Sequence, residues 1–76
     1  MPKTIDGRHL FPPEPLQRTL EALDELAPGD EIQLLLNMRP HPLYRMLKRS
    51  GFAWREVWLD NGSLEIHIFH RPAGTS

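Results

Sequence analysis

The residues of this chain that could do chemistry gather in two short stretches, each of which lies between an apolar segment and a proline-rich one. Both stretches carry histidine and arginine, and the first also carries two carboxylates. Such a set could act as an acid–base pair, or it could bind a metal ion or a small ligand. The candidate ligand-binding residues are Asp6, Arg8, His9 and Glu14 from the first stretch, with Asn37, Arg39 and His41 from the second.

A structural role is the simpler interpretation of the same residues. The acidic and basic residues of the first stretch can hold their own loop together, and the histidines can simply be solvated. We favour that interpretation, and no catalytic dyad or triad can be assigned. His9 and His41 are the candidate metal ligands of the set, and we expect no cofactor. A second pair, His67 and His70, is set aside because an odd separation on a strand sends the two side chains to opposite faces.

The elements that position these stretches follow from hydrophobic periodicity. Residues 3–6 predict a short strand with Ile5 facing inward, and residues 31–37 predict a second strand whose alternate side chains are apolar. Between the two strands, a helix is expected to begin near Pro13 and to stop at residues 28–30. The inward stripe of that helix consists of Leu16, Leu20, Leu23, Leu26 and Ala27.

A strand, a helix and a strand joined this closely make a right-handed parallel unit. The loops after the two strands then leave the same edge of the sheet, where α/β folds usually bind ligands. A second helix is expected to start among the prolines at positions 40 and 42 and to end at Ser50–Gly51. Its buried stripe consists of Leu43, Met46 and Leu47.

The last third of the chain predicts a β-hairpin around Asn61–Gly62, because both residues tolerate the positive φ of a type I′ turn. In that register the large aromatic side chains lie on the face of the sheet that the helices leave open, and such patches mark interfaces. The alternative is that two of the aromatics simply stack across the strands. The register pairs Asp60 with Ser63, Trp58 with Glu65, and Trp54 with Phe69, and the interaction-surface candidates are Leu35, Trp54, Trp58 and Phe69.

The order of elements, βαβαββ, predicts the architecture. We expect a two-layer α/β (α+β) sandwich, with two helices on one face of a four-stranded mixed sheet. The length allows one domain over residues 1–76, with an ordered core at about residues 3–71 and a tail at residues 72–76.

Composition limits the classes of function. The 76 residues include no cysteine, which excludes disulfides, thiolate metal sites and thiol nucleophiles. A net charge of −1 does not indicate duplex nucleic acid or an anionic membrane as partner. No segment approaches the ~20 apolar residues of a membrane span, and the first residues lack the apolar run of a signal peptide, so a cytoplasmic location is expected. The cations that could serve an RNA-binding role are Arg45, Lys48 and Arg49.

Several short motifs lie in order along the chain: Asp6-x-Arg8, then Leu10-x-x-Pro13-x-Pro15, a helix, and Gly29-Asp30 before a strand. Together with the βαβαββ order, they resemble the TusA/SirA sulfur-carrier superfamily. The hallmark of that superfamily is Cys-Pro-x-Pro at the start of the first helix, where the cysteine carries a persulfide. Here Pro12 stands at the position of the cysteine.

A second motif, Pro40-His41-Pro42-Leu43-Tyr44, resembles the Pro-x-Pro-Leu-Tyr of an uncharacterised, cysteine-free branch of the superfamily, a domain of unknown function. That branch has proline where the sulfur carriers have cysteine. It also tends to have His-Asp before this motif, whereas this chain has Met38-Arg39, so no role for those two residues is carried over.

The resemblance without the cysteine implies that persulfide transfer is lost, because a sulfur carrier needs a thiolate. We therefore expect a non-catalytic binding or adaptor module rather than an enzyme. Its expected partner is another protein, or a second copy, at the open face of the sheet. Two alternatives stay open: a small-ligand or metal-binding protein that uses the edge formed by Asp6, His9 and His41, and an RNA-binding accessory domain.

Overall fold

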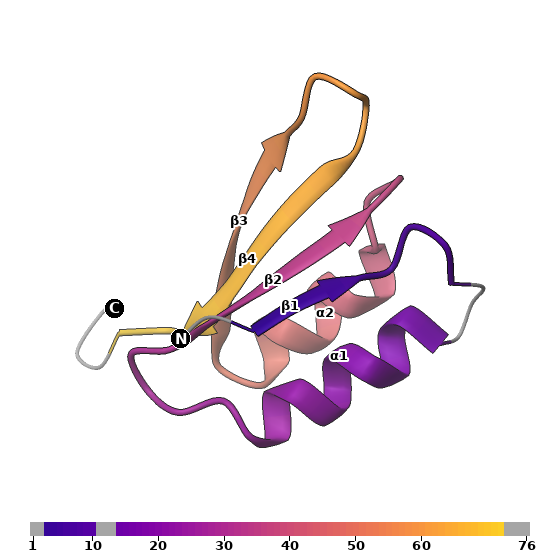
Figure 1. The fold of residues 1–76 in the computed structure, drawn as a ribbon. Helices are drawn as coiled ribbons and strands as arrows, with labels where there is room; N and C mark the ends of the chain where they lie inside the picture. Colours follow the sequence, from indigo (N-terminus) through magenta and orange to yellow (C-terminus); the bar gives the residue numbers. More distant parts are fainter. Residues whose placement is uncertain (1–2, 11–13, 73–76) are drawn as a thin grey trace.

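Four strands and two helices alternate in the predicted order in the computed structural model, which describes residues 3–10 and 14–72. Both helices cover the same face of a single sheet, so the expected two-layer mixed architecture is confirmed (Figure 1). Neither helix in the described part of the chain is long and apolar enough to cross a membrane. The elements are β1 (Lys3–Asp6), α1 (Glu14–Asp24), β2 (Glu31–Leu36), α2 (His41–Arg49), β3 (Phe52–Trp58) and β4 (Leu64–His70).

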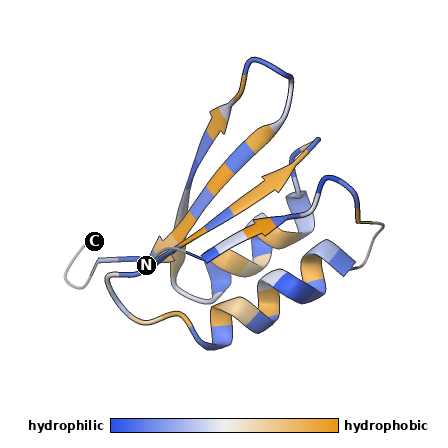
Figure 2. Ribbon diagram, in the orientation of Figure 1, coloured by the Kyte–Doolittle hydropathy of each residue, from blue (hydrophilic) through white to orange (hydrophobic). Residues whose placement is uncertain are grey.

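The sheet has the strand order β1-β2-β4-β3, in which β1 and β2 are parallel and the other neighbours are antiparallel. The central strands β2 and β4 alternate between buried apolar and partly exposed residues, and in β4 the matching alternation of hydropathy is visible as bands of colour in Figure 2. Each fully buried aliphatic side chain stabilises the fold by about 1.5–3 kcal/mol. The residues that β2 and β4 bury beneath the helices are Ile32, Leu34, Leu36, Leu64, Ile66 and Ile68.

The helix α1 packs on the sheet through buried Thr19, Ala22 and Leu23, with Leu16, Leu20 and Leu26 partly buried against the core. The expectation that Ala27 continues this stripe is wrong, because α1 ends at Asp24 and Ala27 is exposed. After α1 the hydrogen bonding changes from i→i−4 to i→i−3, since the N–H of Leu26 donates to the carbonyl of Leu23. Pro28 then disfavours a helical conformation for the residue before it. The predicted start of the helix near Pro13 lies outside the described residues.

The second helix agrees with its prediction. Proline occupies its first turn, Leu43 and Leu47 are buried, and Met46 is partly buried against the core. At its end, the N–H of Ser50 donates to the carbonyls of Met46 and Leu47.

The predicted register of the β3–β4 hairpin is wrong by one residue. The N–H of Leu59 donates to the carbonyl of Ser63 at 2.8 Å, so three residues rather than two form the loop. Gly62 has φ of +86°, and within residues 3–10 and 14–72 only glycines have positive φ, which rules out a type I′ turn at Asn61–Gly62. A three-residue loop with glycine in the left-handed conformation is the next common hairpin connection. As a result Trp58 pairs with Leu64 instead of Glu65.

This shift moves two aromatic residues to the other face of the sheet, since side chains alternate along a strand. Trp54 lies beside Ile68, and Trp58 beside Leu64, so both tryptophans face the helix side. The prediction that they lie on the open face is therefore wrong. Of the four interaction-surface candidates, only Leu35 and Phe69 belong to the open face.

Candidate functional site

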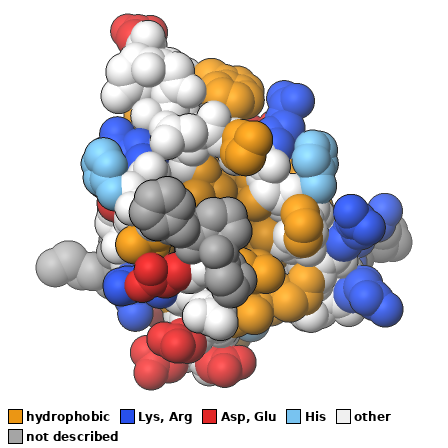
Figure 3. All heavy atoms as spheres, turned by 90° about the vertical axis from the view of Figure 1, so that its right-hand side faces the viewer, with side chains coloured by type: hydrophobic (Ala, Val, Ile, Leu, Met, Phe, Trp, Pro, Cys, Tyr) orange, Lys and Arg blue, Asp and Glu red, His pale blue; other side chains and the backbone are white. Residues whose placement is uncertain are grey.

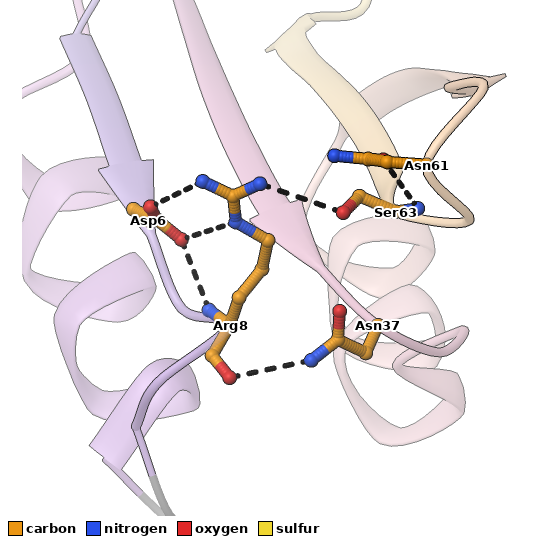
Figure 4. Close-up of polar contacts among 5 residues, drawn as sticks. All are labelled: Asp6, Arg8, Asn37, Asn61 and Ser63. Carbon is orange, nitrogen blue, oxygen red and sulfur yellow. Dashed lines mark hydrogen bonds and ion pairs between the residues drawn. The ribbon is translucent and has the colours of Figure 1, made fainter.

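An ion pair between Asp6 and Arg8 lies at the carboxyl end of β1. The Nε and Nη2 atoms of Arg8 donate to the two carboxylate oxygens of Asp6 at 2.9 and 2.7 Å (Figure 4). The backbone N–H of Arg8 donates to the same carboxylate at 3.1 Å. These hydrogen bonds from Arg8 hold the pKa of Asp6 well below its usual range, and Asp6 in turn raises the pKa of Arg8.

The same arginine ties together three parts of the chain that are distant in sequence. Its carbonyl oxygen accepts a hydrogen bond from Nδ2 of Asn37, which follows β2, at 3.3 Å. Its Nη1 atom lies 3.5 Å from the hydroxyl of Ser63, whose own N–H donates to the side chain of Asn61 in the hairpin loop (Figure 4). Both carboxylate oxygens of Asp6 accept hydrogen bonds from Arg8. This arrangement holds the loops in place, which is the structural role considered for these residues above.

The other candidate ligand-binding residues are not joined to this ion pair. Glu14 pairs with Arg18 one turn along α1 at 3.0 Å, and His41 contacts the ring of Tyr44 edge-on, with centroids 6.4 Å apart. His9 and His41 are both exposed. Across the part of the chain that the structure describes, no three His, Asp or Glu side chains come together as a metal site. The predicted edge cluster is thus divided among separate contacts.

Arg39, from the loop before α2, belongs to a different cluster of residues. Its Nε atom lies 3.1 Å from the carboxylate of Glu56 on β3, and its guanidinium lies 5.7 Å from the ring centroid of Trp58. The hydroxyl of Tyr44 donates to Glu56 as well, at 2.5 Å, and the Tyr44 ring stacks on Trp54 with centroids 4.7 Å apart. Trp54 is thereby packed against α2, whereas Trp58 keeps half of its surface exposed.

The hydrogen bond between Tyr44 and Glu56 changes the ionisation of both groups. Burial, followed by the neighbouring carboxylate of Glu56, raises the pKa of the Tyr44 phenol well above its ordinary value. The hydrogen bond from Tyr44, with further help from Arg39, lowers the pKa of Glu56. At neutral pH the carboxylate is charged and the phenol is a neutral donor, so the cluster is fully hydrogen-bonded.

The open face of the sheet has a polar centre. The ring of His67 lies between two carboxylates, with Nε2 2.5 Å from Glu65 and Nδ1 3.4 Å from Glu31. Glu31 also pairs with Arg55 at 3.2 Å. His70 points to the other face, where its ring contacts Phe52, so the prediction that the two histidines lie on opposite faces of the sheet is confirmed.

Sequence reasoning missed an apolar pocket of about 320 Å³ where β2 ends and both helices begin. Of the lining residues that the structure describes, Thr19 is the one polar side chain besides Arg39, and its hydroxyl already donates to the carbonyl of Pro15 at 2.8 Å. Met38, at the rim, is 73% exposed. The available signal was a methionine two residues after a buried strand, between two proline-rich helix starts. The lining residues are Pro15, Leu16, Thr19, Leu34, Leu36, Met38, Arg39, Pro40, Pro42 and Leu43.

The surface around this end of the molecule is divided by charge. Figure 3 looks from the right-hand side of Figure 1, where both helices begin, and shows a band of apolar side chains to the right of the centre. Acidic side chains gather at the bottom of the view, and basic ones lie at the right of the apolar band and also at the left of the view. The exposed charges of α1 are mostly acidic and those of α2 are basic, so each helix supplies one side.

Comparisons with known proteins agree with this fold. The family model described as "Uncharacterized conserved protein (DUF2249)" matches residues 4–70. The crystal structure of a SirA-like protein from Desulfitobacterium hafniense superimposes with a TM-score of 0.78 at 27% sequence identity, covering 95% of this chain and 100% of that one. No curated protein matches the chain. The resemblance to SirA-like proteins inferred from the motifs is confirmed.

Proposed function

The chain belongs to the DUF2249 family of uncharacterised conserved proteins, and from that premise we propose that it is a non-catalytic protein-recognition module on a SirA-like scaffold. Sulfur carriers hold a persulfide on a cysteine, and these 76 residues contain none. Pro12, at the position of that cysteine, lies outside the described residues. With no thiol to carry sulfur, the retained scaffold serves recognition.

The observation that carries this proposal is the apolar pocket at the start of the two helices. In the sulfur carriers that the motifs resemble, the reactive cysteine stands at the start of the first helix. Here Pro15 and Leu16 of α1 line a pocket whose walls offer almost entirely hydrocarbon, and the guanidinium of the lining residue Arg39 is engaged with Glu56. Among the described lining residues no side chain is a general acid or base, and the one hydroxyl, that of Thr19, is bonded to the backbone, so this lining suits an apolar group of a binding partner.

The exposure of Met38 supports the same function. A methionine that is 73% exposed beside an apolar pocket adds to the apolar surface that a partner would cover. Its flexible, polarisable side chain adapts to different partner shapes. The Asp6–Arg8 ion pair, by contrast, is fully engaged in holding loops, and nothing in its geometry favours ligand or metal binding over that role.

Affinity capture with matched variants tests the proposal. The bait is the tagged chain, compared with Met38→Lys at the pocket and Val57→Lys on the opposite, open face of the sheet. Both residues are exposed and apolar, so both variants add the same charge without disturbing the core. We expect a protein in native lysate that the wild type and Val57→Lys retain and that Met38→Lys loses. Identical capture by all three baits, or loss with Val57→Lys alone, would contradict recognition at the pocket.

A further inference from the structure

We propose that the pocket binds a second copy of this chain, with the two copies related by a two-fold axis that runs parallel to the boundary between α1 and α2. Met38 of each copy packs over the apolar pocket of the other. This inference rests on the proposed recognition function and names its partner. It concerns the helix end of the molecule and not the open face of the sheet.

The pocket and its exposed apolar neighbour lie on one surface. An interface between identical copies needs a patch that is complementary to itself, which a projecting apolar side chain beside an apolar hollow provides. Met38 supplies the projecting side chain, and residues of α1, β2 and α2 supply the hollow of about 320 Å³. The net charge of −1 adds little long-range repulsion between copies.

The exposed charges of the two helices whose first turns line the pocket select the partner and its orientation. The outer side of α1 carries exposed Glu21 and Asp24, and exposed Glu25 follows the helix directly, while Arg18 of α1 is already paired with Glu14. The outer side of α2 carries exposed cations, and Figure 3 shows the two charge types on different sides of the apolar band. The exposed cations of α2 are Arg45, Lys48 and Arg49.

A two-fold axis parallel to the boundary between the helices places the acidic side of each copy on the basic side of the other. An axis at right angles to it would place like charges together, which electrostatic repulsion disfavours. A different protein would have to carry this same division of charge around an apolar centre, whereas a second copy already has it. The contact combines a small apolar centre with exposed charges, so we expect a weak dimer that dissociates further at high salt.

Sedimentation equilibrium over a wide range of concentrations tests the dimer. We expect the wild type to approach twice its monomer mass and Met38→Lys to raise the dissociation constant about tenfold or more. Val57→Lys is the matched control and dimerises like the wild type. Circular dichroism confirms that each variant is folded. A wild type that stays monomeric, or a dimer that Met38→Lys leaves intact, overturns the inference.

A charge-reversal experiment tests the orientation. One variant replaces Arg45, Lys48 and Arg49 by glutamate, and the other replaces Glu21, Asp24 and Glu25 by lysine. Each variant alone presents a single sign of charge and is expected to be monomeric, and an equimolar mixture of the two is expected to dimerise. Dimerisation of each variant alone, or no association in the mixture of folded variants, contradicts the two-fold arrangement. A monomeric wild type that still captures a protein through Met38 overturns the dimer but leaves the proposed function standing.

Discussion

Tyr44 of α2 donates its phenolic hydrogen to the carboxylate of Glu56 on β3, with 2.5 Å between the two oxygens. The contact joins the second helix to an edge strand of the sheet. Arg39 binds the same carboxylate, so the loop that forms the rim of the pocket is held by it too. The hydrogen bond between these two residues therefore contributes to the position of the pocket as well as to the packing of α2.

Replacing Tyr44 with phenylalanine removes the hydrogen bond and keeps the ring that stacks on Trp54. We expect Tyr44→Phe to lower the free energy of unfolding by about 1.5 kcal/mol at pH 7, the lower end for bonds to charged groups, because part of the Glu56 side chain faces water. Since the folded state lowers the pKa of Glu56, this contribution is present above about pH 5 and is lost as the pH falls below about 4. Urea unfolding across this range measures it; a difference independent of pH contradicts the assignment.

The alkaline titration of Tyr44 provides a second test of the same contact. Tyr44 is the one tyrosine in the sequence, so the absorbance of phenolate reports it alone. Because the folded state raises its pKa, the stabilisation is present below about pH 10, the ordinary value, and is lost as the pH rises further. We expect no phenolate in the folded protein at pH 10 and its appearance at higher pH together with unfolding. Half-ionisation near pH 10 in the folded protein would contradict this prediction.

Much of the fold was predictable because periodicity and proline report local constraints directly. The alternating apolar residues of β2 predict a half-buried strand, and prolines limit where each helix can start. The hairpin register was not predictable in this way, since glycine at position 62 fits both a two-residue and a three-residue loop. The choice depends on contacts between distant residues, such as the stacking of Tyr44 on Trp54, and on the bond from Ser63 N–H to Asn61.

The candidate site was predictable only where a motif and a strand end coincide. Asp6, Arg8 and Asn37 were expected at one edge, and the structure brings them together. The pocket was missed because its volume depends on how side chains from three elements fail to fill the space between them, which no local pattern encodes. The ion pair between Arg39 and Glu56 depends in turn on the hairpin register, and a two-residue turn at Asn61–Gly62 predicts a register that differs by one residue from the observed one.

The ion pair between Asp6 and Arg8 makes a prediction about ionisation. In Arg8→Gln the carboxyl of Asp6 loses its charged partner, so its pKa is expected to rise toward the ordinary value of about 3.9. A ¹³C NMR titration of the carboxyl carbon measures this shift. Because the native pKa is lowered, the wild type gains stability from this group above about pH 4 and loses it as the pH falls further.

Arg18→Gln is the control for that titration, because Arg18 pairs with Glu14 on α1 and makes no contact with Asp6 among the described residues. We expect it to leave the pKa of Asp6 unchanged. An Asp6 carboxyl that titrates at the same low pH in Arg8→Gln would show that Arg8 is not the cause of the lowered pKa.

Gly7 is required for a close approach between the loop after β1 and the strand β2. A Cβ added there would lie 2.8 Å from Cδ2 of Leu36 and 3.3 Å from both the carbonyl oxygen of Leu35 and Cβ of Pro15. The Leu36 side chain can shift, but the strand carbonyl and the proline cannot, so we expect Gly7→Ala to lower the free energy of unfolding by about 1–3 kcal/mol. Because Leu36 and Pro15 both line the pocket, the variant should also weaken any binding there.

Gly62→Ala is the contrasting variant, since nothing lies within 4 Å of a Cβ added at position 62 and only its φ of +86° is strained. Enlarging residue 7 from alanine to leucine should destabilise the fold progressively in urea unfolding. At position 62 only φ is strained, so the step from alanine to leucine, which is not branched at Cβ, should change stability far less. Equal stability of Gly7→Ala and the wild type contradicts the close approach.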